Sequence, residues 1–122
     1  MGLRVGLENI ADFARKSGFG RKTGIDLGNE GAGLVPDQAY LDRRYGSGRW
    51  SKGLVLNFSI GQGDLLVTPL QIASLAMTIA NEGQSFQPHI KRSILDPFTF
   101  REEYREPDSL FVKGIDKRHY QL

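Results

Sequence analysis

Apolar residues recur at helical spacing near the start of the chain, which predicts an amphipathic helix over residues 7–17. The side chains expected on its buried face are Leu7, Ile10, Ala11, Ala14 and, widening the stripe, Phe13. Basic residues occupy the last turn, where the helix dipole favours them. Gly18 follows at once and is expected to end the helix.

The clearest start signal for a second helix is at Thr68. Thr68 suits the N-cap, Pro69 the first helical position, and Gln71 the third position of a capping box. The following residues are apolar on nearly every side, so we expect this helix to be buried on most faces. Gly83 is the expected C-terminal glycine.

The other segments carry weaker patterns. Residues 54–60 form a short apolar run that periodicity assigns equally well to a strand or to a helical turn. A strand is expected over residues 89–95 and a short extended run over residues 109–112. Residues 21–39 are rich in glycine and are expected to be irregular.

Composition places the chain among globular domains. Its 122 residues are 39% hydrophobic and 25% charged, which is enough for a modest core. A net charge of +2 gives little support for a polyanionic partner. The absence of cysteine excludes disulfide and thiolate chemistry. No apolar stretch is long enough to span a bilayer, and no secretory signal follows Met1.

Several short motifs occur in a fixed order along residues 1–95. They are Gly18-Phe-Gly-Arg-Lys-Thr-Gly-Ile-Asp-Leu27, Gly33-Leu-Val-Pro36, Trp50-Ser-Lys-Gly53, Ile60-Gly-Gln-Gly63, Thr68-Pro-Leu-Gln71, Ala80-Asn-Glu-Gly83 and Pro88-His-Ile-Lys91. This series resembles the class B penicillin-binding proteins, the D,D-transpeptidases of cell-wall synthesis. The Trp-Ser-Lys-Gly element is most similar to the elongation-type branch, penicillin-binding protein 2.

The resemblance implies an α+β fold, in which this chain supplies mainly the helical subdomain and an entering strand. Residues 1–95 would be part of the transpeptidase domain, between its S-x-N motif and its catalytic K-T-G motif. Residues 96–122 would belong to the same domain, although no motif there matches. The implied reaction of the parent enzyme is acyl transfer from a stem peptide through a serine, inhibited by β-lactams, without a cofactor. The parent would be anchored in the inner membrane with an extracytoplasmic domain.

Lys22-Thr23-Gly24 matches the sequence of the catalytic K-T-G motif, but the two motifs that accompany K-T-G in serine transpeptidases do not occur in this sequence. Serine transpeptidases need a serine nucleophile in S-x-x-K and a later S-x-N, and neither pattern occurs in the 122 residues. In the family, a similar K-T-G-I-D-L run is distinct from the catalytic motif. We therefore expect no catalytic residue in this chain and no activity by the chain alone.

The residues expected nearest the family's substrate cleft are Gly61, Gln62, Gly63 and Asn57. Two glycines around an amide permit close backbone approach, although the same pattern is typical of a tight turn before a helix. His89 and His119 lie far apart in sequence, without the spacing of a zinc site.

Two other functions stay open at this stage. Basic and aromatic residues from Arg43 to Lys52 suit weak nucleic-acid binding, although a solvated loop is the simpler interpretation. A non-catalytic interaction module is the second alternative, and apolar surface on the helix after Thr68 would favour it. Because that helix is so apolar, we expect marginal stability for the isolated chain.

Overall fold

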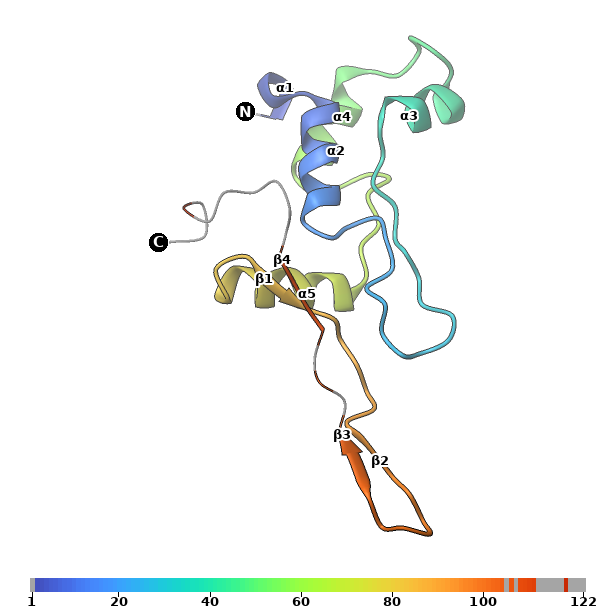
Figure 1. Cartoon of the computed structure of the whole chain (residues 1–122). Helices are drawn as coiled ribbons and strands as arrows, with labels where there is room; N and C mark the ends of the chain where they lie inside the picture. Colours follow the sequence, from blue (N-terminus) through green and yellow to red (C-terminus); the bar gives the residue numbers. More distant parts are fainter. Residues whose placement is uncertain (1, 105, 107, 112–117, 119–122) are drawn as a thin grey trace.

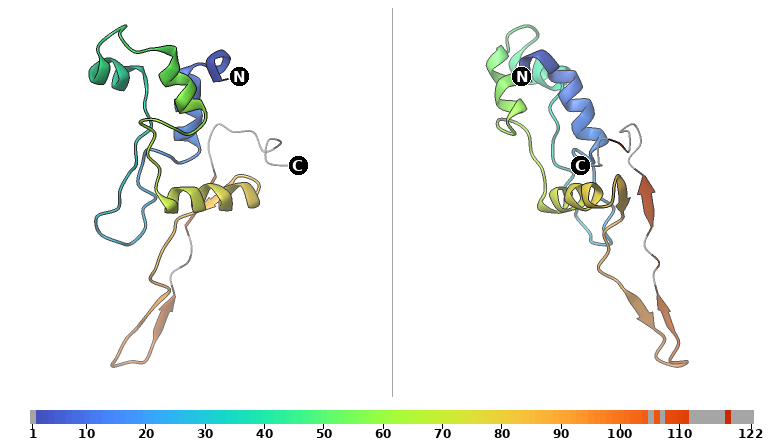
Figure 2. Two further views of the ribbon diagram at one scale, coloured as in Figure 1. Left: turned by 180° about the vertical axis from the view of Figure 1, so that it is seen from behind. Right: turned by 90° about the vertical axis from the view of Figure 1, so that its left-hand side faces the viewer.

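The computed structural model describes residues 2–104, 106, 108–111 and 118. Its elements, in chain order, are α1 (Gly2–Val5), α2 (Leu7–Lys16), α3 (Gln38–Tyr45), α4 (Lys52–Ser59), α5 (Pro69–Ala80), β1 (Gln84–Phe86), β2 (Ser93–Leu95), β3 (Glu102–Tyr104) and β4 (Ser109–Phe111). Helices α1 to α4 gather at one end of the molecule, α5 lies below them, and the β2–β3 hairpin projects away (Figures 1 and 2). The mixture of helices and strands agrees with the expected α+β class.

The apolar core lies among α2, α3, α4 and the loop that precedes α3. Its buried members are Leu7, Ala11, Val35, Leu41, Val55 and Phe58. They come from α2, α3, α4 and the 21–37 segment, so this small core joins elements that are distant in the sequence. Burial of apolar surface of this kind is the main favourable contribution to folding.

The predicted first helix is confirmed as α2, but one side chain was placed wrongly. Leu7 and Ala11 are buried as expected, whereas Phe13 is 60% exposed. Phe13 lies two positions from Ala11, which turns it about 200° around the helix axis. The short helix α1, which precedes α2, was not predicted.

Helix α4 resolves the ambiguous run at residues 54–60 in favour of a helix. Val55 and Phe58 are its buried residues, three positions apart, and both belong to the apolar core. The neighbouring α3 was missed: residues 43–45 are helical, so the expectation of a solvated loop from Arg43 onward was wrong for them. Its sequence signal is Asp37, an N-cap whose carboxylate accepts a hydrogen bond from the backbone N–H of Tyr40.

Helix α5 begins as predicted, but more of its surface is exposed than was predicted. Thr68 Oγ1 accepts the Gln71 N–H, and Gln71 Oε1 accepts the Thr68 N–H, which completes the capping box. Gly83, with a positive φ of 94°, follows the helix, and its N–H bonds to the Thr78 carbonyl. The expectation of burial on most faces was wrong, because Ile72 is 53% and Ile79 49% exposed.

Two small antiparallel sheets follow α5. In the first, β1 pairs with β4 through Gln84–Phe111, Ser85–Leu110 and Phe86–Ser109. In the second, β2 pairs with β3 through Ser93–Tyr104, Ile94–Glu103 and Leu95–Glu102. The strand predicted over residues 89–95 is thus shorter than expected, and β3 was not predicted. The extended run predicted at 109–112 is confirmed over Ser109–Phe111, while residue 112 lies outside the described residues.

Candidate functional site

Glu30 holds the Lys22-Thr23-Gly24 turn. Its carboxylate accepts hydrogen bonds from the Thr23 N–H and hydroxyl at 2.6 Å each, and from the Gly24 N–H at 3.0 Å. These bonds, that of the Thr23 hydroxyl first, hold the pKa of Glu30 below its ordinary value, and nearby Lys22 acts in the same direction. Thr23 and Gly24 therefore have an architectural role in this turn.

Gln71 fixes the same loop from the side of α5. Only 2% of Gln71 is exposed, and its amide nitrogen donates to the Arg21 carbonyl at 2.7 Å and to the Ala32 carbonyl at 2.8 Å. Its amide oxygen is used in the capping box. One buried side chain therefore caps α5 and joins two points of the 21–34 loop, and all of its polar atoms are paired. The sequence indicated the capping role but not the second one.

The loop is also tied to the segment that leads into β2. Asp26 accepts the backbone N–H groups of Ile90 at 2.7 Å and Lys91 at 3.1 Å. The Gln87 side-chain amide donates to the Gly24 carbonyl. Because these amides bond to a carboxylate, residues 90 and 91 stay outside a strand ladder, which explains why β2 begins only at Ser93.

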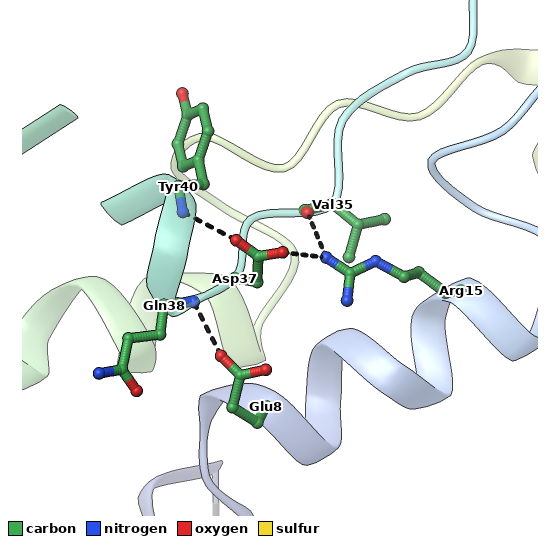
Figure 3. A network of polar contacts seen from close by, with 6 residues as sticks. All are labelled: Glu8, Arg15, Val35, Asp37, Gln38 and Tyr40. Atoms are coloured by element: carbon green, nitrogen blue, oxygen red, sulfur yellow. Dashed lines mark hydrogen bonds and ion pairs between the residues drawn. The ribbon is translucent and has the colours of Figure 1, made fainter. Parts of the chain in front are cut away.

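Carboxylates from two elements meet at the N-terminus of α3. Figure 3 shows Asp37 between the Tyr40 N–H and Arg15. The Arg15 guanidinium donates to the Asp37 carboxylate at 2.6 Å and to the Val35 carbonyl at 3.4 Å. Glu8 of α2 accepts the Gln38 N–H at 2.8 Å. The bond from Tyr40 and the Arg15 contact hold the pKa of Asp37 below its ordinary value. This network fixes α2 against α3.

The four predicted cleft residues lie together at the end of α4. The Asn57 carbonyl accepts the N–H groups of Ile60 at 3.2 Å and Gln62 at 2.8 Å. Gly61 and Gly63 have positive φ values of 75° and 82°. Gln62 and Gly63 line a cavity of only about 10 Å³, the size of a single water molecule. The geometry is that of a tight turn, and proximity to a substrate cleft stays a prediction.

The larger cavity lies elsewhere, between the end of α2, residues 21–23, α5 and β1, and it is called here the α5 cavity. It has a volume of about 580 Å³. Arg15, Lys16, Arg21 and Lys22 line it, together with hydroxyl side chains, and its described lining includes no carboxylate. None of the predicted cleft residues borders it.

Of the basic and aromatic residues from Arg43 to Lys52, Arg44, Tyr45 and Trp50 take part in internal contacts. Arg44 pairs with Asp64 at 3.4 Å and lies 5.6 Å from the Tyr45 ring centroid. The Trp50 indole N–H donates to Asp42 at 2.7 Å, and the ring packs against the apolar core. These contacts reduce the number of side chains available for stacking on bases.

The residues that the structure describes hold neither a metal-binding cluster nor a helix suited to crossing a membrane. No cluster of three histidine, aspartate or glutamate side chains gathers within this part of the chain, and His119 lies outside it. Over the same residues, each helix falls short of the length and hydropathy that a membrane crossing requires.

Comparison with known proteins gives the family. The family model described as the penicillin binding protein transpeptidase domain matches residues 1–122. The chain belongs to the penicillin-binding protein transpeptidase family. This match extends through residues 96–122, where no motif resemblance was found.

Curated relatives of this transpeptidase-family chain are much longer. The chain is 39% identical over 100 residues to the peptidoglycan D,D-transpeptidase MrdA of Acinetobacter baumannii, covering 80% of this chain and 15% of that protein. It is 38% identical over 109 residues to penicillin-binding protein PbpB of Mycobacterium tuberculosis, covering 89% of this chain and again 15% of the relative. The chain therefore corresponds to about a seventh of these relatives.

A solved structure has the same fold over nearly all of the chain. Penicillin-binding protein PBP2 of Helicobacter pylori superposes with a TM-score of 0.74 at 32% identity, covering 98% of this chain and 21% of that one. The recognition of a class B penicillin-binding protein segment and of its α+β fold is thereby confirmed.

Proposed function

We propose that this chain is a structural part of a peptidoglycan D,D-transpeptidase, the enzyme that cross-links cell-wall stem peptides by acyl transfer. The observation that carries the proposal is the family match over residues 1–122, together with 39% identity to a peptidoglycan D,D-transpeptidase. The 122 residues contain no S-x-x-K or S-x-N, so the acylating serine belongs to a part of the parent enzyme that this chain does not include.

The proposed contribution of the chain is to stabilise the structure of the transpeptidase domain, without taking part in the reaction itself. Glu30 accepts hydrogen bonds from Thr23, and Gln71 donates hydrogen bonds to two carbonyls of the 21–34 loop. These bonds are structural. We place Asn57, Gly61, Gln62 and Gly63 beside the parent's substrate cleft, on the strength of their exposure and the positive φ of both glycines. Residues 1–95 and 96–122 are assigned to one transpeptidase domain.

The parent's ligands and location follow the same proposal. One similar solved structure is penicillin-binding protein 3 of M. tuberculosis complexed with ampicillin, and another is a complex of H. pylori PBP2 with MreC. By analogy, the parent of this chain would bind β-lactams and the stem peptide. Its location would be extracytoplasmic, anchored in the inner membrane, with a role in cell shape.

A segment exchange tests the proposal. The matched 100-residue segment of A. baumannii MrdA is replaced by the corresponding part of this chain, and covalent labelling by a fluorescent penicillin is measured. We expect the chimera to be labelled, and a second chimera carrying Gln71→Leu to be labelled more slowly. A folded chimera that takes no penicillin would contradict the proposal.

The isolated chain provides the complementary measurement. After incubation with penicillin, intact-mass spectrometry of the 122-residue chain is expected to show no adduct, because the S-x-x-K nucleophile motif is missing. A stoichiometric adduct would locate a nucleophile within the chain and overturn the structural role.

One observation favours the interaction module as a second candidate. Helix α5 exposes Ile72 and Ile79, and an exposed apolar helix face is typical of a protein-binding surface. A cooperative unfolding transition of the isolated chain, combined with failure of the MrdA chimera, would support this alternative.

A further inference from the structure

The α5 cavity is bordered by a repeated tetrapeptide. Arg15-Lys16-Ser17-Gly18 and Arg21-Lys22-Thr23-Gly24 have the same pattern, six residues apart. All residues of the two tetrapeptides except Gly24 line the cavity. Each tetrapeptide ends at a glycine with positive φ, 96° at Gly18 and 83° at Gly24, so the chain turns after each basic pair.

The charge at this cavity comes mainly from the second tetrapeptide. Arg15 is paired with Asp37 at 2.6 Å, and Lys16 with Asp12 at 2.7 Å. Among the described residues, Arg21 and Lys22 form no ion pair. Glu30, the carboxylate nearest to Thr23, is occupied by three hydrogen bonds and lies outside the lining.

Hydroxyl and apolar side chains complete the walls. Ser74 on α5 and Ser85 on β1 also line the cavity, and Phe86 and Pro88 add apolar surface. Hydroxyl and cationic donors together suit an anionic group, since charge-assisted hydrogen bonds are stronger than neutral ones. The volume of about 580 Å³ is within the usual range of small-molecule sites, about 300–1,000 Å³.

We propose that the α5 cavity, lined by Arg21, Lys22 and the hydroxyl side chains around them, binds a small ligand with a phosphate or carboxylate group and an apolar body. Arg21 and Lys22 supply the positive charge, Ser17 and Ser85 the neutral donors, and Phe86 the apolar contact. This site is separate from the proposed transpeptidase role and does not depend on it.

The test is a titration of the ¹⁵N-labelled 122-residue chain, whose fold is first verified by dispersed amide shifts and a cooperative thermal melt, and binding is followed by the amide chemical shifts. Sodium pyrophosphate and sodium succinate are added in separate arms, with ionic strength held constant by sodium chloride. We expect saturable shifts in residues 15–24 and 85–88, and the more effective of the two probes identifies the anionic group. Shifts that do not saturate in either arm would overturn the proposal.

Matched charge-removal variants locate the binding. Arg21→Gln/Lys22→Gln is expected to weaken binding by about tenfold or more, since each charged hydrogen bond contributes about 1.5–3 kcal/mol, or tenfold and above. Arg43→Gln/Arg49→Gln removes two exposed charges outside the cavity and is expected to change nothing. Equal binding by both double variants would overturn the site.

A single substitution separates a loss of binding from a loss of the fold. Lys22 is exposed and its side chain makes no hydrogen bond or ion pair among the described residues, so Lys22→Gln should keep the fold. Its amide spectrum outside residues 15–24 serves as the check. A folded Lys22→Gln chain with unchanged affinity for both probes would also contradict the proposal.

Discussion

Residues 2–65 bury six apolar side chains against one another, whereas the fully buried side chains described in residues 66–111 are polar, Gln71 and Thr78. The first region is stabilised by apolar burial, which needs no particular direction of contact. Gln71 and Gln87 of the second region donate hydrogen bonds to carbonyls of the 21–34 loop. Asp26 of that loop accepts the N–H groups of residues 90 and 91.

The second region depends on the first through these hydrogen bonds. A hydrogen bond has a net effect of about 1 kcal/mol, but a buried polar group that loses its partner costs about 1–3 kcal/mol. The second region therefore keeps its place only while the 21–34 loop keeps its shape. Its apolar side chains, such as Ile72 and Ile79, contribute little to stability within the described chain because they remain half-exposed.

A substitution in the apolar core of the first region is expected to cause the largest loss of stability. Phe58→Ala removes a buried ring from the apolar core and should lower the free energy of unfolding by about 3–5 kcal/mol. Urea unfolding followed by circular dichroism measures it. Ile79→Ala, on the exposed side of α5, is the control and should change the free energy by less than about 0.5 kcal/mol. Equal effects would mean that the core is not where the stability lies.

Two glycine-to-alanine substitutions test the junction between the regions. Gly33 has a φ of 68°, and an added Cβ would lie 2.4 Å from the Leu66 carbonyl oxygen, so Gly33→Ala should break the Leu34–Leu66 bridge. The strain alone costs about 1–3 kcal/mol. Thermal melts should show a clear loss for Gly33→Ala. Gly31→Ala, where the nearest atom is 3.8 Å away, should melt almost as the unaltered chain does.

The polar anchoring is tested by Gln71→Leu. This change leaves the Arg21 and Ala32 carbonyls without their donor and should cost about 1–3 kcal/mol. Hydrogen exchange should rise in residues 21–34 and at the start of α5, while the core amides of α2 and α4 change less. Gln62→Leu, at an exposed glutamine, is the control. Uniform loss of protection would show that the two regions unfold as one.

The smallest expected effect is a loss of stability in acid. The pKa of Glu30 is lower in the folded chain than in the unfolded one, so the folded state binds fewer protons. The stabilisation is fully present above the unfolded pKa of about 4.3 and is lost as the pH falls through the lowered folded value. Asp37 acts in the same direction.

Unfolding measured from pH 7 to pH 2 checks this dependence. Glu30→Gln should make the acid loss shallower, because one of the carboxylates with a lowered pKa no longer titrates. Glu103→Gln, in the exposed β3 strand, should leave the acid dependence as it is. An unchanged curve for Glu30→Gln would assign the acid sensitivity to other groups.

Local patterns determined much of the fold. The helical spacing at Leu7 and Ala11, the capping box at Thr68 and the glycine after α5 were all predicted, because each depends on residues within one or two turns. The family motifs, also local, led to the correct family. Asp37 was a readable N-cap signal that was overlooked, and with it α3.

Contacts between distant residues were decided only by the tertiary structure. The partners of Gln71 lie 50 and 39 positions away, and Asp26 bonds to amides 64 and 65 positions away, which no periodicity encodes. The same holds for the exposure of α5 and for the cavity that gathers two Arg-Lys pairs. The sequence alone determined where α2 and α5 begin and end, since those hydrogen bonds are short-range. Which faces are covered, and which charges share a cavity, depend on how the chain returns on itself.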